Sequence, residues 1–316
     1  MMVNEITTQD GGMNVFITGA TSAVGRATVR QFIAAGHTVY GATEGSSADA
    51  RMVRADGAIP VYPDLLRAGE VRSAIETANA DVVINLAPQF ANHAHSSAQW
   101  DARQIALITQ GTQSIMEAAT AAGVRFVVHT SYIFAGGHDE SADSLIDAVR
   151  TGEQLVLGCS TPGCVLRFGF IYGTEQPELS ALRATMKMGR AISGGDASAH
   201  SAWLHSDDAA RAVVLAAQKQ PNRAVIDITD DMAASSLDFL TYFADSQGLT
   251  RPSAGARFSL SGLLFGTKKL DIGRIHVEPN RAEARSVLDW TPRFSDYRQG
   301  IDNMLLTWRA EGVAKS

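Results

Sequence analysis

The chain has 316 residues, of which 45% are hydrophobic and 19% are charged. That length suits one large domain or two closely packed ones, and the composition is that of a folded globular protein. With 27 basic and 33 acidic residues, the formal net charge is −6, which gives no general attraction to nucleic acid or to an anionic membrane. No apolar run approaches the roughly 20 residues of a transmembrane helix. The sequence therefore predicts neither a nucleic-acid partner nor a membrane partner.

Residues 1–12 are polar and end in glycine, so we expect a disordered leader there. This segment carries Glu5 and Asp10 and no apolar stretch, which argues against a secretory signal. Two cysteines, Cys159 and Cys164, are too few for a disulfide scaffold or a four-ligand zinc site. Together these features predict reduced thiols and a cytoplasmic location.

Short apolar runs alternate with segments of helical periodicity through the first half of the chain. The runs predict strands over 14–18, 38–40, 59–62, 81–86, 125–130 and 163–167. Between them we expect a helix that ends at Gly36 and helices over 68–78, 98–121 and 144–158. This alternation predicts an α/β fold, a doubly wound parallel sheet of the Rossmann type with helices on both faces.

A glycine-rich turn follows the first predicted strand. Gly19, Ser22 and Gly25 occupy the three positions of the pattern G-x-x-G-x-x-G, with serine in the middle place. A tight turn needs a residue without a Cβ, and the start of the next helix attracts an anion such as a pyrophosphate. The serine hydroxyl is itself a possible phosphate ligand. The context predicts a dinucleotide cofactor bound by Gly19, Thr21, Ser22, Ala23, Val24 and Gly25.

The second half is less regular, with a helix expected over 207–218, a strand over 225–228 and a helix over 236–247. Residues 250–280 show no clear periodicity. We therefore expect a dinucleotide-binding domain over 13–173, to which about 203–229 return. The remainder of 174–316 is expected to form mainly a smaller C-terminal α/β part that binds the substrate.

Further short motifs follow in the order found in one protein family. They are Asp64-Leu65, Asn85-Leu86-Ala87-Pro88, Gly111-Thr112 with Glu117-Ala118-Ala119, His129-Thr130-Ser131, Leu166 to Gly173, Trp203 to Ala210, and Leu288 to Pro292. With the glycine-rich turn they resemble the extended and atypical short-chain dehydrogenase/reductases, the NAD-dependent epimerase/dehydratase family, over residues 13 to about 302.

The resemblance implies a cofactor that lies across the carboxyl ends of the strands and a small C-terminal part that closes over a substrate cleft. It places Asp64 and Leu65 near the adenine. The other residues that it places along the cofactor are Leu86, Ala87, Pro88, Thr130, Phe168 and Phe170.

The resemblance also implies a Tyr-x-x-x-Lys pair, in which the tyrosine moves a proton and the lysine lowers the pKa of that tyrosine. No tyrosine in this chain has a lysine four residues later, and the first 186 residues contain no lysine. Glu153 resembles the end of the family's catalytic helix, and counting back from it puts Leu145 and Val149 at the two positions. The sequence therefore predicts an atypical proton-transfer group.

Ser131 stands where the family carries a catalytic serine, so Ser131 and the adjacent Tyr132 are the predicted catalytic residues. His95 and Tyr172 are further candidates, and Arg150 is a possible electrostatic aid. No metal site is expected, because the acidic residues that follow His205 are typical of a helix start: Asp207 and Asp208.

Glu44 follows the second predicted strand and favours NAD, because a carboxylate accepts hydrogen bonds from the ribose 2′-OH and repels a 2′-phosphate. NADP stays possible, since Arg51 and Arg54 follow nearby.

Three functions stay open: hydride transfer to or from a small carbonyl or alcohol substrate by an NAD(P)-dependent oxidoreductase, a non-catalytic NAD(P)-binding sensor or complex subunit, and a sugar-nucleotide epimerase. The resemblance further implies a homodimer formed through the helices 98–121 and 144–158.

Overall fold

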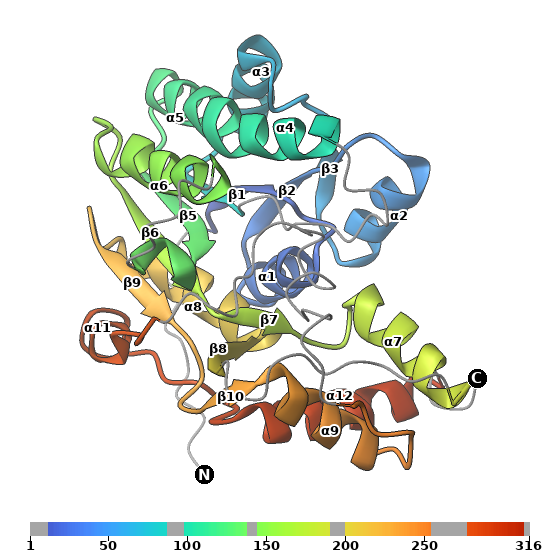
Figure 1. Cartoon of the computed structure of the whole chain (residues 1–316). Coiled ribbons are helices and arrows are strands. Elements are labelled where there is room, and N and C mark those ends of the chain that lie inside the picture. The colour runs from blue at the N-terminus through green and yellow to red at the C-terminus, as the bar shows by residue number, and fades with distance from the viewer. Residues whose placement is uncertain (1–11, 87–97, 138–143, 190–199, 254–276, 313–316) are drawn as a thin grey trace.

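The structure, a computed structural model, describes residues 12–86, 98–137, 144–189, 200–253 and 277–312 (Figure 1). Its centre is a seven-stranded sheet in which every neighbouring pair of strands is parallel. The strand order β3-β2-β1-β4-β5-β6 reverses direction between β1 and β4, as in a Rossmann fold, so the predicted fold class is confirmed. In spatial order the strands are β3 (Ile59–Val61), β2 (Thr38–Ala42), β1 (Asn14–Thr18), β4 (Val82–Asn85), β5 (Phe126–Tyr132), β6 (Gly163–Phe168) and β9 (Val225–Ile228).

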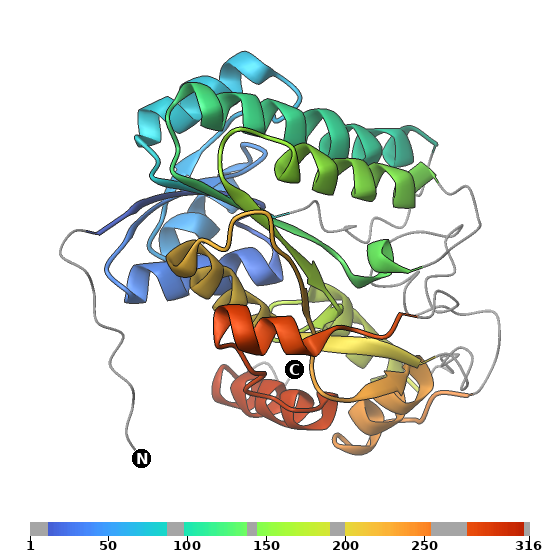
Figure 2. The ribbon, with the colours of Figure 1, turned by 90° about the vertical axis from the view of Figure 1, so that its left-hand side faces the viewer.

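Helices form a layer on each face of this sheet (Figure 2). One layer contains α3 (Ala68–Ala78), α4 (Ala98–Ala106), α5 (Thr112–Ala121) and α6 (Ser144–Leu157). The other contains α1 (Ala23–Ala34), α8 (Ser206–Lys219) and α11 (Arg281–Leu288), and α2 (Ser47–Ala55) connects β2 to β3. The expected single helix 98–121 is interrupted by a π-helical turn, Leu107–Gly111, which joins α4 to α5.

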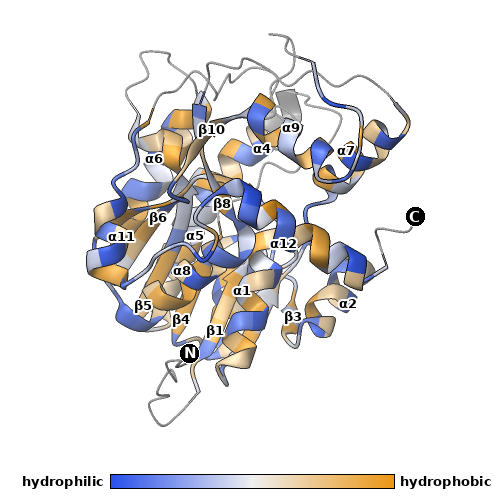
Figure 3. Ribbon diagram, turned by 90° about the horizontal axis from the view of Figure 1, so that it is seen from below, coloured by the Kyte–Doolittle hydropathy of each residue, from blue (hydrophilic) through white to orange (hydrophobic). Residues whose placement is uncertain are grey.

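Burial explains why the strands could be recognised from their apolar runs. All seven residues of β5 and all four residues of β4 are buried, as expected for parallel strands covered on both faces. Figure 3 shows β1, β4 and β5 predominantly in the apolar colour, whereas the helices alternate between apolar and polar residues. Separate apolar cores fill the two spaces between the sheet and its helix layers.

A second sheet has three strands, and its first strand in the chain follows β6 after a single intervening residue, Gly169. It consists of β7 (Phe170–Tyr172), β8 (His200–His205) and β10 (Ala233–Ser235), with β10 antiparallel to β8. Around it pack α7 (Pro177–Lys187), α9 (Ser236–Asp245) and α12 (Tyr297–Ala310), which together form a third core. Aromatic rings fill this core, and the rings of Trp203 and Phe239 stack with their centroids 4.2 Å apart.

The second half is more regular than the sequence predicted. The strand 225–228 is as expected, and as β9 it completes the main sheet beside β6. The strands β7, β8 and β10 were not predicted as a sheet, because each pairs with segments distant in sequence. The helix α7 was also missed, although Pro177 and Glu178 in its first turn and Lys187 in its last turn are ordinary helix signals. The expected leader lies outside the described residues except for Gly12, as do residues 254–276.

Candidate active site

The glycine-rich turn has the geometry of an anion cradle at the start of α1. Gly19 has a φ of 63°, which is in the left-handed region, and the Ser22 amide donates to the Gly19 carbonyl oxygen at 3.0 Å. A Cβ at Gly25 would collide with that same carbonyl, so only glycine allows the turn to close on the helix. The first turn of α1, which begins with Ala23 and Val24, carries no acidic residue. These residues fit the pyrophosphate of a dinucleotide.

Ser22 has a structural function in this turn. Its Oγ accepts a hydrogen bond from the Gly25 amide at 3.0 Å and so caps α1. The hydroxyl proton is not used in that bond and is available to a phosphate oxygen. Thr21 lies half-buried beside Ser22, within the same turn. Serine therefore fits the middle position of the pattern, where the family has a glycine, because its side chain caps the helix that follows.

Leu86 borders the turn from β4. Its Cβ lies 3.4 Å from the position that a Cβ on Gly19 would take, and its carbonyl oxygen accepts from Thr18 Oγ1 at 3.3 Å. The other predicted residues of this segment, Ala87 and Pro88, lie outside the described residues, and so does the candidate His95.

The residues predicted for the adenosine half lie at the ends of β2 and β3. Glu44 is exposed just after β2, and Asp64 Oδ1 accepts from the Leu66 amide at 3.1 Å, which fixes the turn after β3. Leu65 packs against the π-helical turn. Glu44 has a partner that the sequence did not reveal, because Arg103 Nη2 on α4 is 3.9 Å from Glu44 Oε1.

Beneath the turn lies a buried set of uncharged polar groups, here named the asparagine network: Thr18, Asn85, Thr112 and His129. Thr18 Oγ1 donates to Asn85 Oδ1 at 3.0 Å, and Asn85 Nδ2 donates to Thr112 Oγ1 at 3.2 Å and to His129 Nδ1 at 3.0 Å. Burial lowers the pKa of His129 to about 4, so its ring is neutral at physiological pH. The network joins the ends of β1 and β4 to β5 and α5.

A second buried set, the glutamate network, comprises Ser131, Glu153 and Arg167. Ser131 Oγ donates to Glu153 Oε1 at 2.6 Å, and the Arg167 guanidinium donates to both oxygens of that carboxylate at 2.8 and 2.6 Å. Ser131 and Arg167 are paired in register on β5 and β6, so both side chains face α6. While the single hydroxyl proton of Ser131 points at Glu153, Ser131 can only accept hydrogen bonds from a ligand, and it can donate only after its hydroxyl rotates. Sequence reasoning used Glu153 only to set a helix register.

Tyr132, the last residue of β5, lies in an aromatic setting. Its ring stacks on Phe134 in the short 3₁₀ helix Ile133–Gly136, with the centroids 5.1 Å apart. Burial raises the pKa of the Tyr132 phenol well above its ordinary value, which disfavours release of its proton. Thr130 precedes it on β5, and Phe168 and Phe170 stand at the end of β6 and the start of β7, all three buried. The sheet thus brings these residues to one carboxyl edge.

The helix α6 presents no acid or amine at the two implied positions. Leu145 and Val149 are buried in the core of the smaller sheet. Arg150 is a structural clamp, because its guanidinium donates to the carbonyl oxygens of Ala135 and Gly137 at 3.1 and 2.7 Å. Tyr172 is fully buried in the same core, away from the main sheet, and burial raises the pKa of its phenol.

Asp207 and Asp208 lie in the first turn of α8, so they mark a helix start as the sequence predicted. Asp208 accepts hydrogen bonds from the backbone amides of Arg293 and Phe294, so it ties the start of α8 to the C-terminal segment. In the part of the chain that the structure describes, no three His, Cys, Asp or Glu side chains are arranged to hold a metal ion, and no helix is long and apolar enough to span a bilayer.

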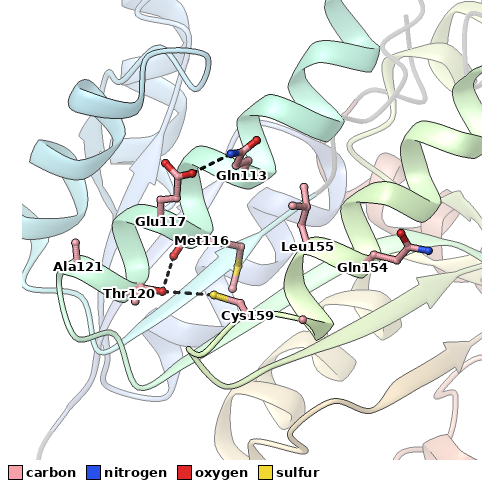
Figure 4. Close-up of a pocket in the computed structure, with 9 residues that line it drawn as sticks. Gln113, Met116, Glu117, Thr120, Ala121, Gln154, Leu155 and Cys159 are labelled. Atoms are coloured by element: carbon pink, nitrogen blue, oxygen red, sulfur yellow. Dashed lines mark hydrogen bonds between the residues drawn. The ribbon is translucent and has the colours of Figure 1, made fainter.

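A groove lies away from this edge, on the outer side of α5 and α6 (Figure 4). Met116, Leu155 and Cys159 provide its apolar floor. Cys159 Sγ lies 3.4 Å from Thr120 Oγ1 at one end of the groove, and Gln113 and Glu117 are joined by a hydrogen bond at the other.

Comparison with known proteins agrees with this geometry. The NAD-dependent epimerase/dehydratase family matches residues 15–228. A "3-diazoavenalumate denitrifying reductase" from a Streptomyces species is 29% identical over 312 residues, which cover 92% of this chain and 99% of the relative. A "4-hydroxy-2-methyl-3-oxo-4-farnesyl-3,4-dihydroquinoline-1-oxide ketoreductase" from Stigmatella aurantiaca is 27% identical over 259 residues, 75% of this chain and 74% of the relative.

The fold is also that of a solved structure, the Bordetella bronchiseptica enzyme WbmG in complex with NAD and UDP. It superposes with a TM-score of 0.76 at 16% identity and covers 96% of this chain and 97% of its own. The family match extends from the first strand through β9, and it includes the cradle, the strand ends and the two polar networks. The chain therefore belongs to the NAD-dependent epimerase/dehydratase family, with NAD as its cofactor.

Proposed function

We propose that this protein is an NAD-dependent reductase that transfers a hydride to a small aromatic or carbonyl substrate without a Tyr-x-x-x-Lys pair. The observation that carries the proposal is on α6. Leu145 and Val149 stand at the two positions that the family pattern implies, and both are buried among apolar side chains. Neither position supplies an acid or a cation, so the preferred reactions are those that need least help with a proton.

The chemistry of a diazo group meets that condition. Bound NADH supplies a hydride, while the protein orients the cofactor and the substrate. When a hydride adds to the carbon of an aryl diazonium, a C–H bond forms, the C–N bond breaks, and its electron pair leaves with dinitrogen. No substrate oxygen has to be protonated. The Streptomyces relative, which spans nearly the whole chain, is named for a denitrifying reduction of a diazo compound.

Ketone reduction is the second candidate, supported by the name of the Stigmatella relative and by the position of Ser131. Reduction of a carbonyl requires a hydride on carbon and a proton on oxygen. In this scheme the Ser131 hydroxyl turns from Glu153 and donates a hydrogen bond to the substrate oxygen, because both atoms would otherwise be acceptors. Tyr132 borders the same strand end, and its buried phenol is better suited to packing than to proton donation. The proton that the substrate oxygen needs therefore comes from a group other than Ser131 or Tyr132.

Two other hypotheses have less support. A sugar-nucleotide epimerase of this family would use the tyrosine that position 145 lacks. A non-catalytic sensor or complex subunit requires only the cofactor cradle, and both curated relatives carry the names of reductases.

A substrate panel tests the proposal. The purified protein is incubated with NADH deuterated at C4 and with an aryl diazonium salt, an aromatic ketone or UDP-glucose. We expect NADH oxidation and transfer of deuterium to carbon with the diazonium salt or the ketone, and no reaction with UDP-glucose. Epimerisation of UDP-glucose without net oxidation of NADH would overturn the proposal. Saturable NADH binding with no turnover across the panel would favour the sensor.

The variant Ser131→Ala separates the two reductions. We expect a loss of about 10² or more in turnover of the ketone, because the contact to its oxygen disappears, and little change with the diazonium salt. A protein sample inactivated by heat controls for direct reduction of the diazonium salt by NADH. An unchanged rate with the ketone would remove Ser131 from the site.

NAD is further proposed to be preferred over NADP, because Glu44 lies two residues after β2, where an acidic residue of a Rossmann fold binds the ribose. NADH is therefore expected to bind several-fold more tightly than NADPH. A fluorescence titration with each nucleotide measures this ratio, and tighter binding of NADPH would contradict the preference.

The protein is also proposed to act as a cytoplasmic homodimer. Both cysteines are free thiols, which suits a reducing compartment. The groove on α5 and α6 is apolar at its floor and carries one charged residue, Glu117, at its rim. Light scattering tests the oligomeric state, and a monomer would contradict it.

A further inference from the structure

The adenosine end of the proposed cofactor site contains a pair of opposite charges that bridges two separate elements. Glu44 follows β2, and Arg103 is on α4, 59 residues later in the chain. Arg103 Nη2 is 3.9 Å from Glu44 Oε1, and the two side chains are 52% and 83% exposed, respectively. Both groups are therefore accessible to a bound nucleotide, and at this distance the ion pair is loose enough to open.

The helix that carries Arg103 is held in place next to this end of the site. The π-helical turn Leu107–Gly111 adds a residue to the helical path, which shifts the side-chain positions of α4 by about 100° around the helix axis relative to those of α5. The same turn packs on Leu65 after β3, with 3.7 Å between Leu65 Cβ and the position of a Cβ on Gly111. The turn thus holds the C-terminal end of α4 beside Leu65, which the resemblance places near the adenine, and Arg103 lies in that last turn of α4.

The charges have opposite effects on the two forms of the cofactor. A carboxylate alone at this place accepts bonds from a 2′-OH and repels a 2′-phosphate, whereas a guanidinium binds a phosphate through two parallel N–H groups. With NADH, Glu44 can leave Arg103 for the ribose. With NADPH, Arg103 can leave Glu44 for the phosphate and screen the carboxylate from it.

We propose that Arg103 is a specificity-determining residue that allows this protein to bind NADPH as well as NADH. The inference rests on the proposed binding of the dinucleotide at the carboxyl edge. If Arg103 binds the 2′-phosphate, the affinities for NADH and NADPH differ only several-fold. Glu44 without Arg103 would exclude NADPH.

The experiment is a titration of the full-length protein with NADH and, separately, NADPH, followed by nucleotide fluorescence. Arg103→Gln is expected to weaken NADPH binding about tenfold and to change NADH binding by less than about twofold, since a charge-assisted pair to a phosphate is lost. Glu44→Gln is expected to shift the ratio in the opposite direction, by strengthening NADPH binding.

Arg72→Gln is the matched control, because Arg72 is an exposed arginine in an ion pair with Glu76 on α3. That variant is expected to leave both affinities unchanged. An unchanged ratio of NADPH to NADH affinity in Arg103→Gln would overturn the inference while leaving the cofactor site intact. Absence of binding of both nucleotides to the unmodified protein would instead overturn the proposed cofactor function, and this inference with it.

Discussion

The asparagine and glutamate networks lie two residues apart on β5, yet they differ in charge. His129 belongs to the first and Ser131 to the second. The first network is made of hydroxyl, amide and neutral imidazole groups only. The second contains a carboxylate with three donors from two side chains, all centred on Glu153.

This difference in charge matches the part of the site that lies above each network. The uncharged network lies under the cradle, where a pyrophosphate brings its own negative charge and a buried carboxylate would repel it. The charged network lies under the ends of β5 and β6, where the proposed substrate meets the cofactor. Loss of one bond from the neutral network leaves an unsatisfied polar group, whereas removal of one partner of the buried ion pair leaves an unpaired charge, which costs more free energy.

The largest expected effect comes from breaking the ion pair. Glu153→Leu leaves the Arg167 guanidinium half-buried without its partner, and we expect the free energy of unfolding to fall by about 3–5 kcal/mol. Chemical denaturation measures the change. The double variant Glu153→Leu/Arg167→Met is expected to recover most of the loss, because no unpaired charge remains. A double variant as unstable as the single one would show that the loss is due to packing.

Acid is expected to weaken the uncharged network. His129 has a pKa of about 4 in the folded protein and about 6.5 when unfolded, so the unfolded chain binds more protons between these values. The stability that neutral His129 contributes is complete above pH 6.5 and is lost as the pH falls toward 4, by about 2 kcal/mol between about pH 7 and pH 5. Urea midpoints across this range measure it. Burial also lowers the pKa of His205 to about 4, so that residue contributes to the same slope. His129→Gln, which cannot titrate, should therefore reduce the slope by about half, and a profile of unchanged slope would contradict the assignment.

A smaller effect is expected from one hydroxyl of the uncharged network. Thr18→Val keeps the shape of the side chain but leaves Asn85 Oδ1 without its donor, at a cost of about 1–2 kcal/mol in unfolding free energy. Thr28→Val on α1 is the matched control, because Thr28 Oγ1 is buried and has no hydrogen-bond partner among the described residues. The control should be neutral or stabilising. Equal losses in the two variants would show that the Thr18–Asn85 bond contributes nothing.

The smallest effect is expected at the helix cap. Ser22→Ala removes the acceptor for the Gly25 amide and should lower the free energy of unfolding by about 1 kcal/mol, whereas Ser22→Gly should lower it by only a few tenths. Thermal unfolding compares the two variants. NADH affinity should be retained in the glycine variant, which restores the full glycine pattern. A marked loss of affinity there would mean that the serine hydroxyl itself holds the phosphate.

The sequence predicted those parts of the site that depend on neighbouring residues. The cradle was visible because its turn, its cap and its helix start all lie between Thr18 and Gly25, and the buried strands were visible as apolar runs. The glutamate network was not visible, since Ser131, Glu153 and Arg167 come from three elements and no spacing relates them. The same reason hid the ion pair between Glu44 and Arg103. The three-stranded sheet was missed because β10 and β8 meet only through the tertiary fold.

The position of β9 has a consequence for how the protein folds as it is made. β9 is parallel to β6 at one edge of the main sheet, but the chain builds β7 and β8 between them. During synthesis the open side of β6 therefore stays without its partner until residue 228 has left the ribosome. An unpaired strand edge is a template for pairing with other chains, and contacts between distant segments form slowly. We expect truncated chains that end before β9 to be the aggregation-prone species, and complete chains to gain protection as this last strand joins.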